Sequence, residues 1–124
     1  MRTEPPLSLQ DKRAAMDITF DALYFDALKA DLVEKNPRKA IYKLQRCISI
    51  DKTNPAVYFK MGEIYYKMKQ LPEAIQMLEK AEGLDGGNKW YKLLLAEVYQ
   101  KAKRFEEATQ TYEALVENDP HNMQ

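Results

Sequence analysis

The chain has 124 residues, with 19 basic and 19 acidic side chains and a formal net charge of zero. This balance argues against a general electrostatic grip on nucleic acid, which needs an excess of basic residues. Helix-favouring residues dominate, glycine occurs only four times, and there is no run of 18 apolar residues. We therefore expect an all-α protein without a membrane span.

The N-terminal part predicts a short tail followed by one long helix. Residues 1–8 are expected to be disordered, and Met1–Pro6 contain no apolar core of a signal peptide, which leaves the compartment undecided. Ser8 and Asp11 give a weak N-cap signal, and nothing interrupts a helix over about 9–34. The apolar residues that recur along it at helical spacing include Leu9, Met16, Phe20, Leu23 and Ala27. This helix either caps the domain or binds another chain through Met16, Phe20 and Leu23.

Turn and capping residues predict five further helices. Asn36-Pro37 and Asn54-Pro55 each offer an N-cap followed by proline at the first helical position. Pro72 suits another helix start, and Gly86-Gly87 ends the helix that begins there. The expected helices cover about 37–50, 55–69, 72–84, 88–102 and 105–118, with a tail at 121–124.

These helices belong to units that repeat every 34 residues. One alanine, one aspartate and one lysine recur in all three units, as Ala40, Ala74 and Ala108, Asp51, Asp85 and Asp119, and Lys35, Lys69 and Lys103. Within a unit the apolar spacing is helical, as in Met61, Ile64, Tyr65 and Met68. We expect a single domain over 9–120 with repeats at about 21–54, 55–88 and 89–120.

A helix–turn–helix unit of this length resembles the tetratricopeptide repeat (TPR) family, over residues 21–120. The second unit carries the family's large and small packing residues as Tyr58, Met61, Gly62, Tyr65, Ala74, Leu78 and Ala81. The third carries them as Leu95, Ala96, Tyr99, Phe105, Ala108, Tyr112 and Pro120. The first is degenerate, because Leu28 replaces the small residue and Asp31 replaces the tyrosine. The resemblance implies an alpha solenoid, a right-handed superhelical stack of three antiparallel helix hairpins in which Gly62 and Ala96 face Ala74 and Ala108.

The resemblance also implies a scaffold that binds a protein or peptide. In this family the first helix of each hairpin lines a concave groove, where partners usually lie as extended peptides. The matching positions are Phe25, Lys29, Leu32, Phe59, Glu63, Tyr66, Lys67, Trp90, Leu93, Glu97 and Lys101. Aromatic rings with charges of both signs suit a peptide of mixed character. For Phe59 and Trp90, packing between repeats is the alternative to binding.

One class of ligand is not expected. Chaperone-binding members of the family hold a terminal carboxylate with Lys, Asn and Arg side chains on successive first helices. The matching positions here hold Phe25, Lys29, Lys60, Trp90 and Leu94. This set lacks the clamp, so we expect no binding to the acidic C-terminal tails of cytosolic chaperones.

No residues point to catalysis, a metal or a cofactor, and we do not expect an enzyme. His121 is the only histidine, and Cys47, the only cysteine, falls at a position that the repeat fills with Ala81 and Leu115. We expect Cys47 to be a core residue, with a reactive thiol as the alternative. A basic stripe at Lys35, Arg38, Lys39, Lys43 and Arg46 is expected to be a solvated face, with an anionic partner as the alternative.

The last predicted helix leaves a second function open. A solenoid must cover its terminal apolar face, and part of the face formed by Ala108, Tyr112, Leu115 and Val116 is expected to be open. The chain is then a fragment of a longer array, a weak homodimer through this helix, or a monomer that tolerates the patch. The alternative function is accordingly a structural protein that assembles by stacking.

Overall fold

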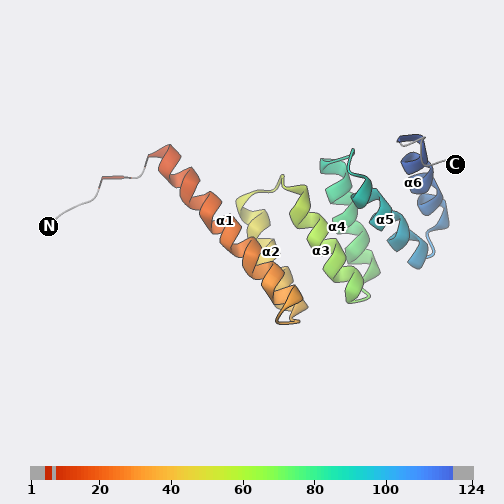
Figure 1. The fold of residues 1–124 in the computed structure, drawn as a ribbon, viewed down its shortest axis with the longest axis horizontal. Helices are drawn as coiled ribbons and strands as arrows, with labels where there is room; N and C mark the ends of the chain where they lie inside the picture. Colours follow the sequence, from red (N-terminus) through yellow and green to blue (C-terminus); the bar gives the residue numbers. More distant parts are fainter. Residues whose placement is uncertain (1–4, 7, 119–124) are drawn as a thin grey trace. The chain divides into compact units, whose positions relative to one another are not determined.

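A computed structural model of the chain describes residues 5–6 and 8–118, and this part contains six α-helices and no strand. In chain order they are α1 (Leu9–Leu32), α2 (Pro37–Ile50), α3 (Pro55–Lys67), α4 (Leu71–Leu84), α5 (Lys89–Lys101) and α6 (Phe105–Asn118) (Figure 1). The all-α fold and all six helices are confirmed, with bounds that differ from expectation by no more than two residues. The expected tails lie largely outside the described residues.

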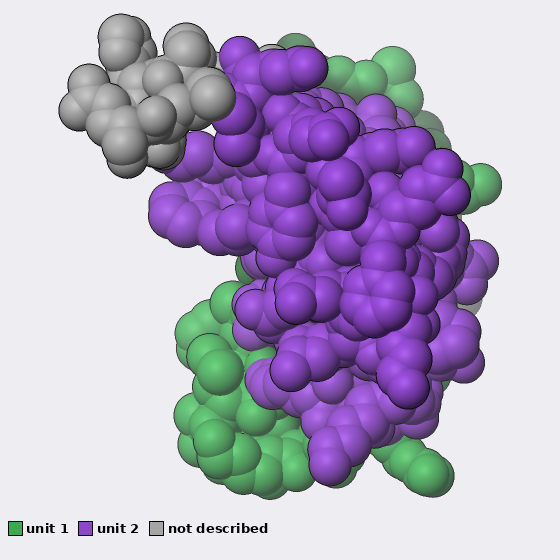
Figure 2. Space-filling view, turned by 90° about the vertical axis from the view of Figure 1, so that its right-hand side faces the viewer, with its two compact units in different colours: residues 1–52 green, residues 53–124 purple. Residues whose placement is uncertain are grey.

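The chain divides into two compact units, residues 1–52 and 53–124, coloured separately in Figure 2. Unit 1 holds the hairpin of α1 and α2, and unit 2 holds the hairpins α3–α4 and α5–α6. The boundary falls where the first repeat was expected to end. The expectation of one domain over 9–120 stays a prediction.

Side-chain caps fix where the helices begin. Ser8 and Asp11 form a reciprocal capping box at the start of α1. Asn36, Asn54 and Asn88 each accept a backbone N–H in the first turn of the helix that follows. Because the first N–H groups of a helix have no partner within it, these caps set the starts of four helices.

Unit 1 is held together along one face of α1. Leu23, Ala27 and Ala30 are buried on that face, and α2 contributes its own buried residues Ala40, Ile41, Leu44 and Cys47. Cys47 Sγ donates to the carbonyl oxygen of Phe20 across a distance of 3.8 Å. The sequence-based idea that Leu23 is offered to another chain is therefore wrong, because α1 uses it to build the hairpin.

The core of unit 2 is made by both of its hairpins. Its buried members come from α4, α5 and α6 and are Ala74, Ile75, Leu78, Leu95, Val98, Tyr99 and Ala108. Tyr99 joins two of these helices, since its ring lies in the core while its hydroxyl donates to Glu79 of α4 at 2.7 Å. Neither hairpin of unit 2 buries its apolar face alone, as expected for stacked repeats.

Gly62 lets α3 and α4 approach closely. A Cβ atom added there would lie 2.6 Å from Cγ of Leu78 and 3.4 Å from the carbonyl oxygen of Ala74. Leu78 is fully buried and has no free space to move into. The expected pairing of Gly62 with Ala74 is thus sharpened, because the tightest contact is with Leu78.

The lysine that recurs every 34 residues has a conformational role that the sequence did not suggest. Lys35, Lys69 and Lys103 adopt positive φ values of 55°, 62° and 62°. After α3, Lys69 N–H bonds to the carbonyl of Tyr66 and Gln70 N–H to that of Tyr65. This is the Schellman pattern that ends a helix, with lysine at the position that usually holds glycine.

We predict that Gly62→Ala destabilises the chain by about 1–3 kcal/mol, because the added methyl group overlaps a buried leucine that cannot shift freely. Urea denaturation followed by circular dichroism measures this change.

Gly83→Ala is the matched control. Gly83 lies in α4, and an added Cβ meets nothing within 4 Å. The same substitution there should stabilise the chain by up to about 1 kcal/mol through helix propensity. Equal effects at the two positions would contradict the close-approach explanation.

Candidate functional site

Unit 2 carries an open hollow where α3, α5 and α6 meet. It is lined by Tyr66, Glu97, Gln100, Lys101, Lys103, Phe105 and Tyr112. Tyr66, Glu97 and Lys101 were predicted groove residues, and the structure brings them together. The other four were missed. Gln100 could have been found, because it lies 34 residues after Tyr66, whereas Lys103, Phe105 and Tyr112 belong to the turn and the second helix of the hairpin.

Tyr66 and Glu97 form a fixed pair on one wall of the hollow. Burial raises the pKa of Tyr66 to about 12, and its side-chain hydrogen bond to Glu97 contributes to the increase. The phenol therefore stays protonated and donates to the carboxylate at neutral pH. The pair joins α3 to α5 and orients both side chains.

The rest of the hollow offers cations beside aromatic rings. Among the described residues, Lys101 and Lys103 form no ion pair, so both ammonium groups are available to a ligand. Phe105 is 60% exposed and Tyr112 is 39% exposed. Such a surface can contact an apolar side chain and pair with an acceptor group on the same ligand.

The two candidate aromatic anchors have different roles. The Phe59 ring stacks on Tyr91, with 4.6 Å between ring centroids, and packs against the core of unit 2. Trp90 is 64% exposed, and its ring lies 5.5 Å from Nζ of Lys89. The packing alternative thus describes Phe59, whereas Trp90 is open to a ligand.

Four predicted groove residues share one face of α5. Trp90, Leu93, Glu97 and Lys101 follow one another at intervals of three or four residues, so they form a stripe along the helix. Leu93 is 46% exposed. The stripe begins with an exposed apolar pair and ends in the hollow at Glu97 and Lys101.

The remaining predicted residues are less available or lie elsewhere. Glu63 forms an ion pair with Lys60, with 3.7 Å between charged atoms. Lys67 is exposed in the last turn of α3. Phe25, Lys29 and Leu32 are exposed on α1 in unit 1.

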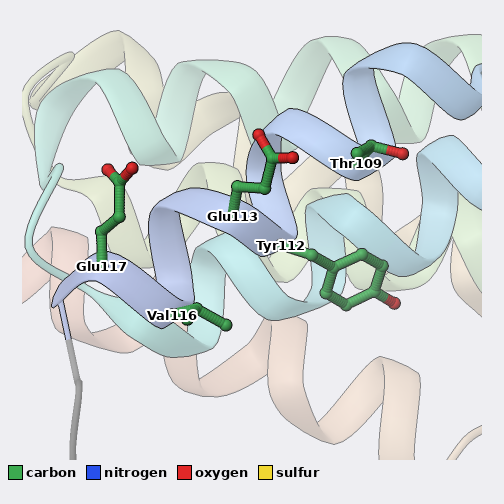
Figure 3. A pocket seen from close by; sticks show the side chains of 5 residues that line it. All are labelled: Thr109, Tyr112, Glu113, Val116 and Glu117. Carbon is green, nitrogen blue, oxygen red and sulfur yellow. The ribbon is translucent and has the colours of Figure 1, made fainter. Parts of the chain in front are cut away.

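A second, shallow hollow lies on α6 itself. It is lined by Thr109, Tyr112, Glu113, Val116 and Glu117 (Figure 3). Glu113 and Glu117 point to the same side, and Val116 is 41% exposed. Part of the apolar face of α6 is open within the described residues, as the sequence indicated. A homodimer through this helix stays a prediction.

Metal-binding and membrane-spanning features were also sought in the described part of the chain. It holds no group of three or more His, Cys, Asp and Glu side chains that could bind a metal ion. Its helices are too short or too polar to cross a membrane. His121 lies outside the described residues.

The sequence was then compared with known proteins. A model of the tetratricopeptide repeat matches residues 32–82 and 70–124, which together cover most of the chain. The chain belongs to the tetratricopeptide repeat family. No curated protein matches this TPR chain.

Solved TPR structures share its fold at low sequence identity. MamA has a TM-score of 0.75 and 22% identity over 82% of this chain, which spans 55% of the MamA chain. The second TPR of Spaghetti (RPAP3), bound to the HSP90 peptide SRMEEVD, has a TM-score of 0.74 and 18% identity, with 86% and 99% of the two chains covered. SycD of Yersinia enterocolitica, in complex with a peptide of the translocator YopD, has a TM-score of 0.74 and 19% identity, with 82% and 76% covered. At these identities the likeness shows the fold, which confirms the all-α helical repeat.

We predict that Cys47 is inert in the folded TPR chain. Burial raises the pKa of its thiol from 9.0 to about 11, with Arg46 opposing the shift. This change lowers the thiolate fraction at pH 8 by about 100-fold, so reaction with Ellman's reagent should be at least that much slower than in urea.

The same shift carries a stability prediction. Because the pKa of the folded state is the higher one, its contribution is present below pH 9 and is lost as the pH rises towards 11. Reaction of the native chain at the rate of a free thiol would contradict the core assignment.

Proposed function

We propose that this TPR chain is a protein-interaction scaffold that holds an extended peptide along α5 of unit 2. The observation that carries the proposal is an exposed tryptophan on the same helical face as a hollow with two available lysines. Trp90 starts that face, and Lys101 lies where it enters the hollow. An open aromatic anchor followed by polar groups is the composition of a recognition surface.

The geometry limits the length of the peptide. Trp90 and Lys101 are 11 positions apart, which corresponds to roughly 17 Å along an α-helix. An extended chain covers that distance with about five residues. We infer a short segment with an aromatic side chain against Trp90 and Leu93, and an acceptor group near Lys101 and Lys103.

The similar structures support a peptide ligand in general terms. Spaghetti (RPAP3) and SycD were each solved with a peptide bound. For a terminal carboxylate, however, the positions that match the chaperone clamp are unsuitable here. Lys60 is already paired with Glu63, and Trp90 and Leu94 are apolar.

We predict that Trp90→Ala weakens peptide binding by at least about tenfold, because Trp90 supplies the exposed anchor. Peptides are first selected from a random display library on the full chain, and their affinities are then measured by fluorescence anisotropy. Lys101→Ala should weaken the same peptides, with a larger effect at low ionic strength.

Tyr42→Ala is the matched control, because Tyr42 is 57% exposed on α2, away from this surface. It should leave affinity unchanged. The HSP90 peptide SRMEEVD contains no aromatic residue and should not bind, and amidating the C-terminus of a selected peptide should not change its affinity. Equal losses from Trp90→Ala and Tyr42→Ala, or micromolar binding of SRMEEVD, would contradict the proposal.

A further inference from the structure

An apolar stripe runs along the exposed side of α1. Its large members are Ile18, Phe25 and Leu32, which are 70%, 67% and 56% exposed. The exposed residues Ala15, Ala22 and Lys29 alternate with them at intervals of three and four residues. This spacing repeats every seven residues and is the seam of a helix that pairs with another helix.

The seam lies opposite the face that builds unit 1. At 100° per residue, Phe25 lies about 160° around the helix from Ala27, which is fully buried against the hairpin. Apolar residues on both faces explain why the sequence pattern was misread. Phe20 and Leu23 share the helical spacing of the seam but face the hairpin, where Phe20 is half-buried and Leu23 buried.

Charge decides which direction a second helix of the same kind would take. In a parallel pair in register, flanking residues five positions apart meet across the seam. Asp21 would then face Asp26 of the second copy twice, and Lys29 would meet its own equivalent. Like charges at these positions are unfavourable, so a parallel pair of α1 helices is disfavoured.

An antiparallel pair has a register that matches both size and charge. When paired seam positions add up to 40, Ala15 lies opposite Phe25 of the second copy, and Ile18 lies opposite its Ala22. Each large side chain then meets a small one, which lets the helices interlock. The arrangement has a two-fold axis, so every contact occurs twice, as in an isologous dimer.

The charges at this register are largely complementary. Lys29 lies opposite Asp11 of the second copy, and Lys12 flanks the seam beside its Asp26. Each pair occurs twice, against a single repulsion between the two copies of Asp21. In one copy Lys12, Asp26 and Lys29 are exposed and form no ion pair among the described residues. Opposite charges beside a seam select partner and direction.

We propose that α1 is a homodimerisation helix, and that two copies of this chain pair antiparallel through Ala15, Ile18, Ala22 and Phe25. The proposal gives Phe25 and Lys29 a partner other than the peptide groove. It is independent of peptide binding on unit 2, because it uses residues of unit 1 alone.

Sedimentation equilibrium of the full chain, from low micromolar to submillimolar concentration, tests the proposal. The wild type should associate to a dimer, and Phe25→Asp should weaken the association by at least about 100-fold by placing a charge in the seam. Met16→Asp is the matched control, since Met16 is 52% exposed on α1 but lies off the seam. It should leave the dimer intact, and circular dichroism checks that both variants keep their helix content.

Charge exchange tests the register. Lys12→Glu and Asp26→Lys should each weaken the dimer, and the double variant should restore it, because both crossed pairs become opposite in charge again. A wild type that stays monomeric overturns the proposal, as does a dimer that survives Phe25→Asp. Loss of the dimer in Val116→Asp but not in Phe25→Asp would assign the interface to α6 instead.

Discussion

The fold depends on the close approach of the two helices in each hairpin. Gly62 leaves no room for a Cβ atom beside Leu78, and Ala40, Ala74 and Ala108 are all buried on the facing helices. A small residue at this point lets the large residues above and below it fill the gap between helices. The 34-residue repeat of that small residue therefore decides which face of each helix turns inward.

The same constraint decides which side chains stay outside. Once the inner face of α5 is occupied by Tyr91, Leu95 and Val98, Trp90 and Leu93 are left exposed on the other side. In α1, burial of Leu23 and Ala27 leaves Ile18 and Phe25 exposed in the same way. Large exposed apolar residues in ordered rows are typical of interaction surfaces, and the two rows here have different chemistry. The row on α5 leads to available lysines, whereas that on α1 is flanked by charges of both signs.

The sequence predicted the helices and the core well because both follow from local spacing and from the repeat. Asn–Pro pairs gave the starts of α2 and α3, and the recurring alanine gave the buried positions. The sequence could not separate Phe59 from Trp90, because whether an aromatic ring packs or projects depends on the neighbouring helix. It also missed Lys103 and Phe105, since the hollow is completed by a turn and a second helix that the groove positions do not include. The apolar stripe on α1 was hidden by a second apolar face on the same helix.

The central claim is that the rows left exposed by repeat packing are binding surfaces and not tolerated apolar patches. Hydrogen–deuterium exchange of the full chain, measured by mass spectrometry at several chain concentrations with and without a selected peptide, tests it most directly. The account predicts that amide exchange in residues 9–32 slows as the chain concentration rises, and that exchange in residues 89–101 slows when peptide is added. Exchange that is independent of both concentration and peptide in these two segments would contradict it.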